Sequence, residues 1–242
     1  MIERFHAIVL RIVKHNDKIQ IADVLTKEHG RLSFAIPAGS MTARKGSTRM
    51  VWRPLAMLEF DANIGAQKGL PRPKDVRVYA HYADIPYNPL KSMIAMFINE
   101  MLAGVLWSEQ AEPSLYAFVE QSCMILDERN GAYANFPIAF AIQLLRFLGV
   151  QPSDDAFGTE RFYDLLAAEY VDFVPAHDNY LRGEEAQAVK TILRMNYTNM
   201  HRFRMNRRQR QRVLEIINDF YRIHVPDFRR MKSLEVFADA LS

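Results

Sequence analysis

Residues 6–36, with the sequence HAIVLRIVKHNDKIQIADVLTKEHGRLSFAI, alternate between short apolar segments and polar turns. Ile, Val and Leu dominate the apolar segments, and these residues favour β-strands. The second turn ends at Gly30, which can adopt the positive φ that a tight turn needs. The pattern therefore predicts three consecutive strands, at 6–13, 19–25 and 31–36.

Two further strands are expected in the first 82 residues, at 50–60 and 75–82. Pro54 lies inside the first of them, and proline cannot donate a hydrogen bond to a neighbouring strand, so we expect a bulge or an edge position there. Polar loops that contain Gly precede these strands, at 38–48 and 63–73. Five short strands in a segment of this length are typical of a small barrel, and the count fits a five-stranded OB-fold barrel.

The spacing of apolar residues changes at Asn88, which favours the start of a helix, and Pro89 suits the first helical position. Apolar residues then recur at three- and four-residue steps. The fold class is therefore α+β, with an OB-fold barrel at 1–82 and an all-α helical domain at 83–242 that contains an irregular insertion at about 150–181. Helices are expected at 89–107, 113–126, 135–149, 184–195, 206–224 and 233–240, with a short hairpin at 161–164 and 169–173.

The composition excludes several classes of protein. The 242 residues are 49% hydrophobic and 24% charged, which is typical of a globular chain and not of a disordered one. Cys123 is the one cysteine, which excludes a disulfide framework and a zinc site of several thiolates. Its apolar neighbours predict a packed core thiol, and we expect no metal and no cofactor. No apolar run approaches the roughly 18 residues of a membrane-spanning helix, so we expect no membrane partner and a cytoplasmic location.

The common catalytic motifs are missing from the sequence. It contains no Walker loop, no GxGxxG, no GxSxG, no HExxH and no CxxC. Asp154, Asp155 and Glu160 leave open a metal-dependent nuclease, although carboxylates in a loop are usually solvated. We therefore expect that the protein is not an enzyme.

The charges are unevenly distributed along the chain. Residues 1–80 hold 14 Lys and Arg against 7 Asp and Glu, for a net charge of +7. Residues 81–190 hold 6 against 16, for −10, and residues 191–242 hold 11 against 5, for +6. Two basic regions that flank an acidic one indicate a polyanionic partner for the two ends of the chain.

The first basic region surrounds the two long loops of the expected barrel. OB barrels bind single strands by placing the phosphate backbone along cationic loops and stacking bases on aromatic rings. Trp52 fits either such a stacking role or the barrel core. The candidate DNA-binding residues here are Arg44, Lys45, Arg49, Trp52, Arg53, Lys68, Arg72 and Lys74.

The second basic region is denser and consists almost entirely of arginine, with ten Arg and one Lys after residue 190. Guanidinium groups match phosphate or carboxylate oxygens in a bidentate geometry. Glu215 and Asp219 lie at helical spacing from Arg212 and Arg222 and are expected to pair with them. The candidates for DNA contact have no acidic residue within four positions: Arg202, Arg204, Arg207 and Arg208.

Several motifs, in order along the whole chain, resemble the bacterial DNA repair protein RecO family. Residues 26–32, TKEHGRL, resemble its N-terminal signature T-x-E-x-G-[RK]-L. Many members hold a zinc ion with four cysteines after a later L-G-[FV]-x-P run, but here that segment has no cysteine, and residues 162–165 and 170–173 are expected to form a packed hairpin instead. The other matches are AIVLR at 7–11, RKGS at 44–47, WRPLAMLEF at 52–60, FPI at 136–138, LLRFLGVQP at 144–152 and MKSLEVF at 231–237.

This resemblance implies binding to single- and double-stranded DNA, annealing of complementary strands and help in loading RecA during recombinational repair, in the cytoplasm at the nucleoid. It also implies two protein partners, RecR and the C-terminal tail of the single-strand binding protein (SSB). That tail is acidic and apolar and ends in a carboxylate, so its receptor needs a cation beside an apolar groove. Arg129 and Arg146 are the candidates, with Phe147 or Leu148 helping to floor the groove. Alternatively, Arg146 pairs with Asp127 or Glu128.

A second interpretation, from a different class of protein, stays open. The acidic helical region could be the working surface of a protein-interaction scaffold, with DNA binding incidental. A steep fall of DNA affinity with salt would favour the first interpretation, because phosphate contacts release counterions.

Overall fold

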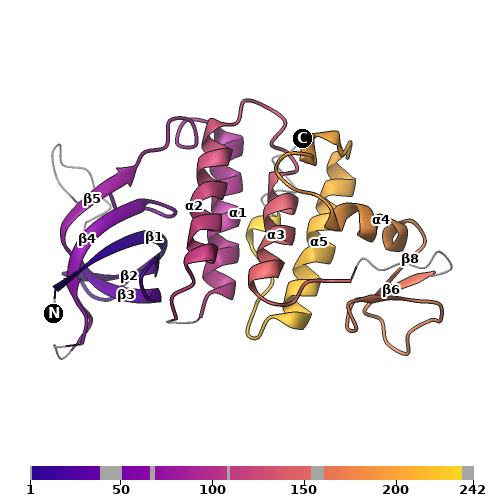
Figure 1. Ribbon diagram of the computed structural model, residues 1–242, viewed down its shortest axis with the longest axis horizontal. Coiled ribbons are helices and arrows are strands. Elements are labelled where there is room, and N and C mark those ends of the chain that lie inside the picture. The colour runs from indigo at the N-terminus through magenta and orange to yellow at the C-terminus, as the bar shows by residue number, and fades with distance from the viewer. Residues whose placement is uncertain (1, 39–50, 66–68, 108–109, 154–160, 236–242) are drawn as a thin grey trace. The chain divides into compact units, whose positions relative to one another are not determined.

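The computed structural model describes residues 2–38, 51–65, 69–107, 110–153 and 161–235. The chain packs as two compact units, residues 1–129 and residues 130–242. Figure 1 labels most of the helices and strands of both units. The domain boundary predicted at residue 82 divides the chain at a different point and stays a prediction.

The first unit contains a five-stranded antiparallel sheet with the order β3-β2-β1-β4-β5 (Figure 1). β1 pairs with β2 on one side and β4 on the other, and its register shifts between Val9 and Arg11. The strand ladder does not close into a barrel within the described residues, although the Ala35 N–H donates to the Pro71 carbonyl (2.9 Å) just before β5. The predicted α+β class and its five strands are confirmed, as a partly open sheet of the OB type. The strands are β1 (Ile2–Lys14), β2 (Ile19–Thr26), β3 (Gly30–Pro37), β4 (Met57–Asn63) and β5 (Lys74–Ala80).

β4 begins later than the sequence predicted. Residues 52–56 form a turn in which Leu55 has a φ of 60°. This turn is held to β1, because the Leu55 N–H donates to the Val9 carbonyl at 2.8 Å. Pro54 therefore lies outside the strand ladder, where its lack of an N–H group does not remove a hydrogen bond between strands.

Alternate residues of the strands form the core of the sheet. Phe5, Phe34 and Phe60 come from β1, β3 and β4, and their ring centroids lie 4.9 to 5.7 Å apart. All three are at most 1% exposed. These core residues alternate along each strand because successive side chains point to opposite faces of a sheet. β1 and β2 also bury residues of the opposite face, such as Ile8 and Leu25.

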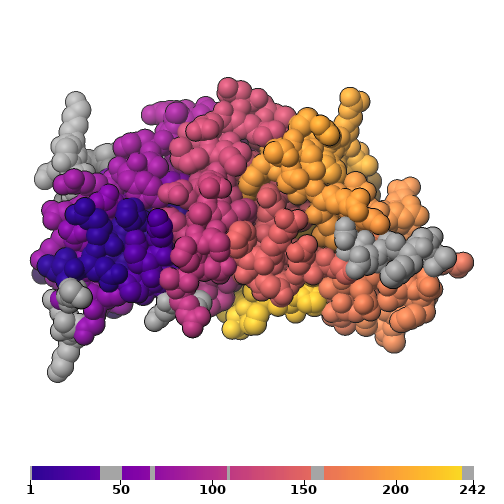
Figure 2. All heavy atoms as spheres, viewed as in Figure 1, coloured from indigo at the N-terminus to yellow at the C-terminus, as the bar shows by residue number. Residues whose placement is uncertain are grey.

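Two helices, α1 (Pro89–Val105) and α2 (Pro113–Glu128), complete the first unit, and Asn88 caps α1 as predicted. A buried ionic network fastens them to the segment after β5. The fully buried Lys91 Nζ lies 2.7 Å from the Asp84 carboxylate and donates to the Asp127 carbonyl at 2.6 Å. The Asp127 carboxylate accepts the N–H groups of residues 83–85 at 2.7 to 2.9 Å. In Figure 2 the strands and these helices form one continuous surface, coloured indigo to magenta.

The second unit combines helices with a small sheet of order β7-β6-β8. The predicted hairpin is confirmed, and a third short strand was not expected from the sequence. The Tyr221 hydroxyl donates to the Ala141 carbonyl at 2.6 Å and ties α5 to α3. The predicted last helix, 233–240, extends beyond the described residues. The elements are α3 (Phe136–Phe147), β6 (Phe162–Asp164), β7 (Glu169–Val171), β8 (Tyr180–Arg182), α4 (Glu184–Leu193), a 3-10 helix (Met200–Arg202) and α5 (Arg207–His224).

Candidate nucleic-acid interface

Three predicted DNA-binding cations of the first unit, Arg53, Arg72 and Lys74, are described, and all are exposed. Within the described residues none of them has an ion-pair partner. Arg72 and Lys74 line a groove of about 710 Å³ that also touches Ile19 of β2 and Ala35 of β3. The other predicted cations, Arg44, Lys45, Arg49 and Lys68, lie outside the described residues.

Trp52 belongs to the core of the sheet. Its side chain is 3% exposed, and its ring centroid lies 5.8 Å from that of Phe60. A ring buried in this way has no face available to a nucleic-acid base. The core alternative therefore accounts for Trp52, and we leave it out of the proposed interface.

Other cations of the sheet are held in ion pairs. Asp23 of β2 is 5% exposed and accepts hydrogen bonds from Arg11 Nη2 at 2.7 Å, Arg31 Nη2 at 3.1 Å and Ser33 Oγ at 2.6 Å. Burial raises the pKa of Asp23, but the hydrogen bonds from Ser33, Arg11 and Arg31 outweigh it and leave the pKa lowered. Asp23 is thus the anionic centre of an ordered network across three strands.

The second basic region lies at the start of α5. Arg202 ends the 3-10 helix, Arg204 follows it, and Arg207 and Arg208 form the first turn of α5. Asn206 caps α5 through a capping box, in which its side chain accepts the Gln209 N–H at 2.9 Å. The N-terminal end of a helix carries a partial positive charge, so two arginines here are unfavourable unless an anion binds.

These four arginines have no ion-pair partner within residues 161–235 or the other described parts of the chain. The nearby arginines of α5, in contrast, have partners within the second unit. Arg212 forms a bidentate pair with Glu185 of α4, at 2.6 and 3.1 Å, and Arg222 pairs with Asp219 at 3.3 Å. Arg210 is half-buried and donates to Asn135 Oδ1 at 3.0 Å, and burial lowers its pKa. The expected pairing of Arg222 with Asp219 is confirmed, whereas Glu185 is a closer partner of Arg212 than the expected Glu215, at 3.9 Å.

A groove of about 860 Å³ lies between α4 and the segment 203–216. Arg204 and Arg208 line it beside apolar side chains that include Ile192 and Val213. Arg204 also lines a second hollow of about 490 Å³, next to His201. Two of the four unpaired arginines, Arg204 and Arg208, thus lie at concave surfaces, where their charges can act together on a bound anion.

The two candidates for the SSB-tail site lie in different units. Arg129 follows α2 and is half-buried, whereas Arg146, in the last turn of α3, is exposed. Within the described residues of the second unit, Arg146 has no ion-pair partner. The alternative pairing with Asp127 or Glu128 involves residues of the first unit and stays a prediction. A ligand can reach the exposed side chain of Arg146.

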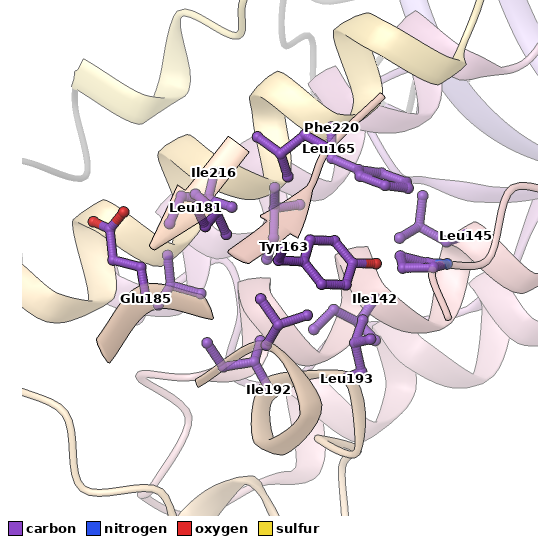
Figure 3. A pocket seen from close by; sticks show the side chains of 14 residues that line it. Ile142, Leu145, Tyr163, Leu165, Leu181, Glu185, Ile192, Leu193, Ile216 and Phe220 are labelled. Carbon is purple, nitrogen blue, oxygen red and sulfur yellow. The ribbon is translucent and has the colours of Figure 1, made fainter. Parts of the chain in front are cut away.

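An apolar cavity of about 60 Å³ lies beside α3, but neither Arg146 nor the expected floor residues Phe147 and Leu148 line it. Figure 3 shows the ring of Tyr163 extending into it among residues that include Leu145. The Tyr163 hydroxyl donates to the Ala168 carbonyl at 2.9 Å. The cavity is part of the packing between the small sheet and the helices, and its volume is too small for a peptide.

The described residues contain no group of three or more His, Cys, Asp and Glu side chains that could hold a metal ion. His177 Nε2 lies 3.2 Å from the Asp164 carboxylate. Cys123 is buried, as predicted, and burial raises the pKa of its thiol to about 12. The nuclease candidates Asp154, Asp155 and Glu160 lie outside the described residues.

Among the helices that the structure describes, none has the length and hydrophobicity that crossing a membrane requires.

Comparison with known proteins gives a consistent result over the whole chain. Residues 1–82 match the family model described as "Recombination protein O N terminal", and residues 86–235 match "Recombination protein O C terminal". A DNA repair protein RecO of Phocaeicola vulgatus is 37% identical, with 100% of both chains covered. RecO proteins of Bacteroides fragilis and Porphyromonas gingivalis are 36% and 33% identical over 99% and 96% of each chain. The chain therefore belongs to the RecO family of DNA repair proteins.

Proposed function

We propose that this chain is a non-enzymatic mediator of recombinational repair that binds single- and double-stranded DNA, anneals complementary strands and helps load the recombinase RecA. It acts with two protein partners, RecR and the acidic tail of SSB. It works in the cytoplasm, associated with the nucleoid. Family membership supports the repair role, and the unpaired cations support the DNA contact.

The observation that carries the DNA contact is the set Arg202, Arg204, Arg207 and Arg208. Four exposed or half-exposed guanidinium groups lie within seven residues, without an ion pair among the described residues and at the positive end of α5. Such a group of like charges is destabilising by itself, and a phosphate backbone offsets the repulsion. Each guanidinium that contacts a phosphate releases counterions, which makes binding depend on salt.

A second cationic surface makes annealing possible in addition to binding. Arg53, Arg72 and Lys74 lie in the first unit and the arginine group in the second, so the chain offers cations on two separately packed bodies. Two phosphate backbones repel each other, and bringing them together requires neutralisation of both. This arrangement supports annealing by charge neutralisation, which needs no nucleotide cofactor.

We assign binding of the SSB tail to Arg146. Its guanidinium is exposed and unpaired among the described residues, in an otherwise acidic part of the sequence. A terminal carboxylate fits the bidentate geometry of arginine. Half-buried Arg129 is the second candidate.

The test measures DNA affinity against salt concentration for the wild type and for the double variant Arg207→Gln/Arg208→Gln. The wild type should show a steep linear fall of log affinity with log salt. The double variant should bind more weakly to all sequences, and its slope should be smaller by about 1 to 2, because each lost phosphate contact on duplex DNA removes about 0.9.

The matched control is Arg212→Gln/Arg222→Gln, which removes the same charge from the same helix at arginines that are already paired. It should leave the slope nearly unchanged. A weak response to salt in the wild type would contradict DNA binding and favour the protein-interaction scaffold. Equal losses in both double variants would show that only net charge matters and would exclude a specific role for the unpaired arginines.

A further inference from the structure

The two tryptophans of the chain differ sharply in exposure. Trp52 is 3% exposed, whereas Trp107, directly after α1, is 58% exposed. The Trp107 indole N–H donates to the Gly104 carbonyl at 3.0 Å, which fixes one edge of the ring to the end of α1. Trp107 is thus an exposed aromatic ring with a defined orientation.

Arg31 supports the ring from one side. The central carbon of its guanidinium lies 5.0 Å from the Trp107 ring centroid, a cation–π distance. Arg31 cannot swing away, because its guanidinium also donates to the carbonyls of Leu106 at 2.5 Å and Ala103 at 3.3 Å and to Asp23 at 3.1 Å. Since Arg31 covers one face of the ring, the exposed part of Trp107 consists of the other face and the outer edges.

The surroundings of this ring are polar and cationic. Asp23 joins Arg31 to Arg11, and this group of two guanidiniums and one carboxylate carries a net charge of +1. Arg11 has a 58% exposed side chain that binds Asp23 through Nε and Nη2, and its Nη1 has no hydrogen bond within the described residues. Arg11 can therefore present N–H groups to a phosphate beside the ring.

From this arrangement we infer that Trp107 is a stacking platform for an unpaired base of single-stranded DNA, with Arg11 contacting the adjacent phosphate. The inference rests on the DNA binding proposed above and adds the residue that distinguishes single strands from duplex. Bases in a duplex are already stacked on each other, whereas an unpaired base gains from stacking on an aromatic side chain. The ring contacts a cation and a backbone carbonyl, and a cationic surface beside an aromatic ring fits a ligand that carries both a base and a phosphate.

The test compares Trp107→Ala and Trp107→Phe with the wild type in binding to oligo(dT) and to duplex DNA, with the intrinsic tryptophan emission recorded in the same titrations. Trp107→Ala should lose about tenfold in affinity for oligo(dT), since stacking on one base contributes about this much, and less than about twofold for duplex DNA. Trp107→Phe should keep most of the affinity. Oligo(dT) should quench the emission of the wild type but not that of Trp107→Phe, whose one tryptophan is the buried Trp52.

The matched control is Tyr87→Ala, which removes another exposed aromatic ring of the same unit, 83% exposed, and should not change binding. If the wild type binds oligo(dT) without quenching and Trp107→Ala binds it equally well, the stacking role is overturned while DNA binding stands, and Trp107 becomes a contact for a protein. An equal loss for single strands and duplex would also overturn stacking. If the wild type binds neither DNA at low salt, this inference and the proposed function fail together.

Discussion

The two basic regions carry nearly the same net charge, +7 in residues 1–80 and +6 in residues 191–242, but they hold that charge differently. In the described part of the first, Arg4, Arg11 and Arg31 are paired with carboxylates of the sheet. The unpaired cations described there are Arg53, in the turn before β4, and Arg72 and Lys74, which line one groove. In the second, four arginines without a partner among the described residues lie within the segment 202–208. Net charge alone would rank the regions as equal, whereas among the described residues the density of unpaired charge, which decides the local potential, is higher in the second.

The difference between the two basic regions can be tested by neutralising the unpaired cations of each region in a separate variant. Changing Arg202, Arg204, Arg207 and Arg208 to Gln should make the slope of log affinity against log salt shallower by up to about 3.6 on duplex DNA, at about 0.9 per phosphate. Changing Arg53, Arg72 and Lys74 to Gln should lower it by about 2 or less, because dispersed cations meet fewer phosphates at once. Salt titrations of both variants measure the two slopes. A larger effect in the first region would reverse the ranking.

Arg146 lies in the acidic region between the two basic ones, and its proposed role in binding the SSB tail can be tested with a peptide. Arg146→Ala should weaken binding of a short acidic SSB-tail peptide by about tenfold, because a charge-assisted hydrogen bond contributes about 1.5 to 3 kcal/mol. Fluorescence anisotropy of a labelled peptide measures the effect, and Arg182→Ala, at another exposed arginine of the second unit, is the control. Equal affinities of Arg146→Ala and the wild type would assign the tail to another surface.

The ion-paired cations of the first basic region can be tested through protein stability by changing their shared partner, Asp23. Asp23→Asn should lower the free energy of unfolding at pH 7 by about 2 kcal/mol, since it removes charge-assisted hydrogen bonds from Arg11 and Arg31. The pKa of Asp23 is lowered in the folded state, so its contribution is present above the unfolded pKa of about 3.9 and is lost as pH falls through the folded value. The difference between the two proteins should therefore be constant near neutral pH and shrink below about pH 4. Urea unfolding across this range measures it, and a difference that grows toward low pH would contradict the assignment.

Replacing an unpaired or a paired arginine of α5 should change the stability of the fold slightly, and in opposite directions. Arg207→Gln should stabilise the fold by about 0.3 kcal/mol, because it removes a cation from the positive end of the helix. Arg222→Gln should destabilise it by a similar amount, about 0.3 kcal/mol, since Arg222 lies in the last turns of the helix and pairs with Asp219. Thermal unfolding measures both. Two destabilising changes would mean that Arg207 is held by contacts in the folded state, which would weaken its assignment to DNA.

Much of the fold was predictable, because periodicity records burial. The apolar segments that predicted β1 to β3 are largely buried, and the three- and four-residue steps in the first predicted helix correspond to the buried face of α1. β8 was missed because its three residues carry no pattern of their own and are a strand only through their pairing with β6, as in Phe162 with Arg182. The start of β4 was misplaced because the apolar residues before it fill the core from a turn and not from a strand.

The site was less predictable, because ion pairing is a long-range property. Local spacing did identify the unpaired arginines, since no carboxylate lies near them in sequence, and it predicted the pair of Arg222 and Asp219. It could not reveal that Glu185, 27 positions away, neutralises Arg212. Nor could it tell which tryptophan is exposed, since Trp107 differs from Trp52 only in what the rest of the chain packs against it.

The buried network of Lys91, Asp84 and Asp127 has a consequence for how this protein can be dissected. A fragment that ends at residue 82, where the N-terminal family match ends, would contain the strands without Asp127 and Lys91. It would also expose the side of β1 where Asn99 of α1 donates to the Leu10 carbonyl at 2.8 Å. A fragment that ends at residue 129 keeps the whole network. The end of the N-terminal family match and the end of the first compact unit therefore differ in this chain, and the longer fragment is the one that retains these contacts.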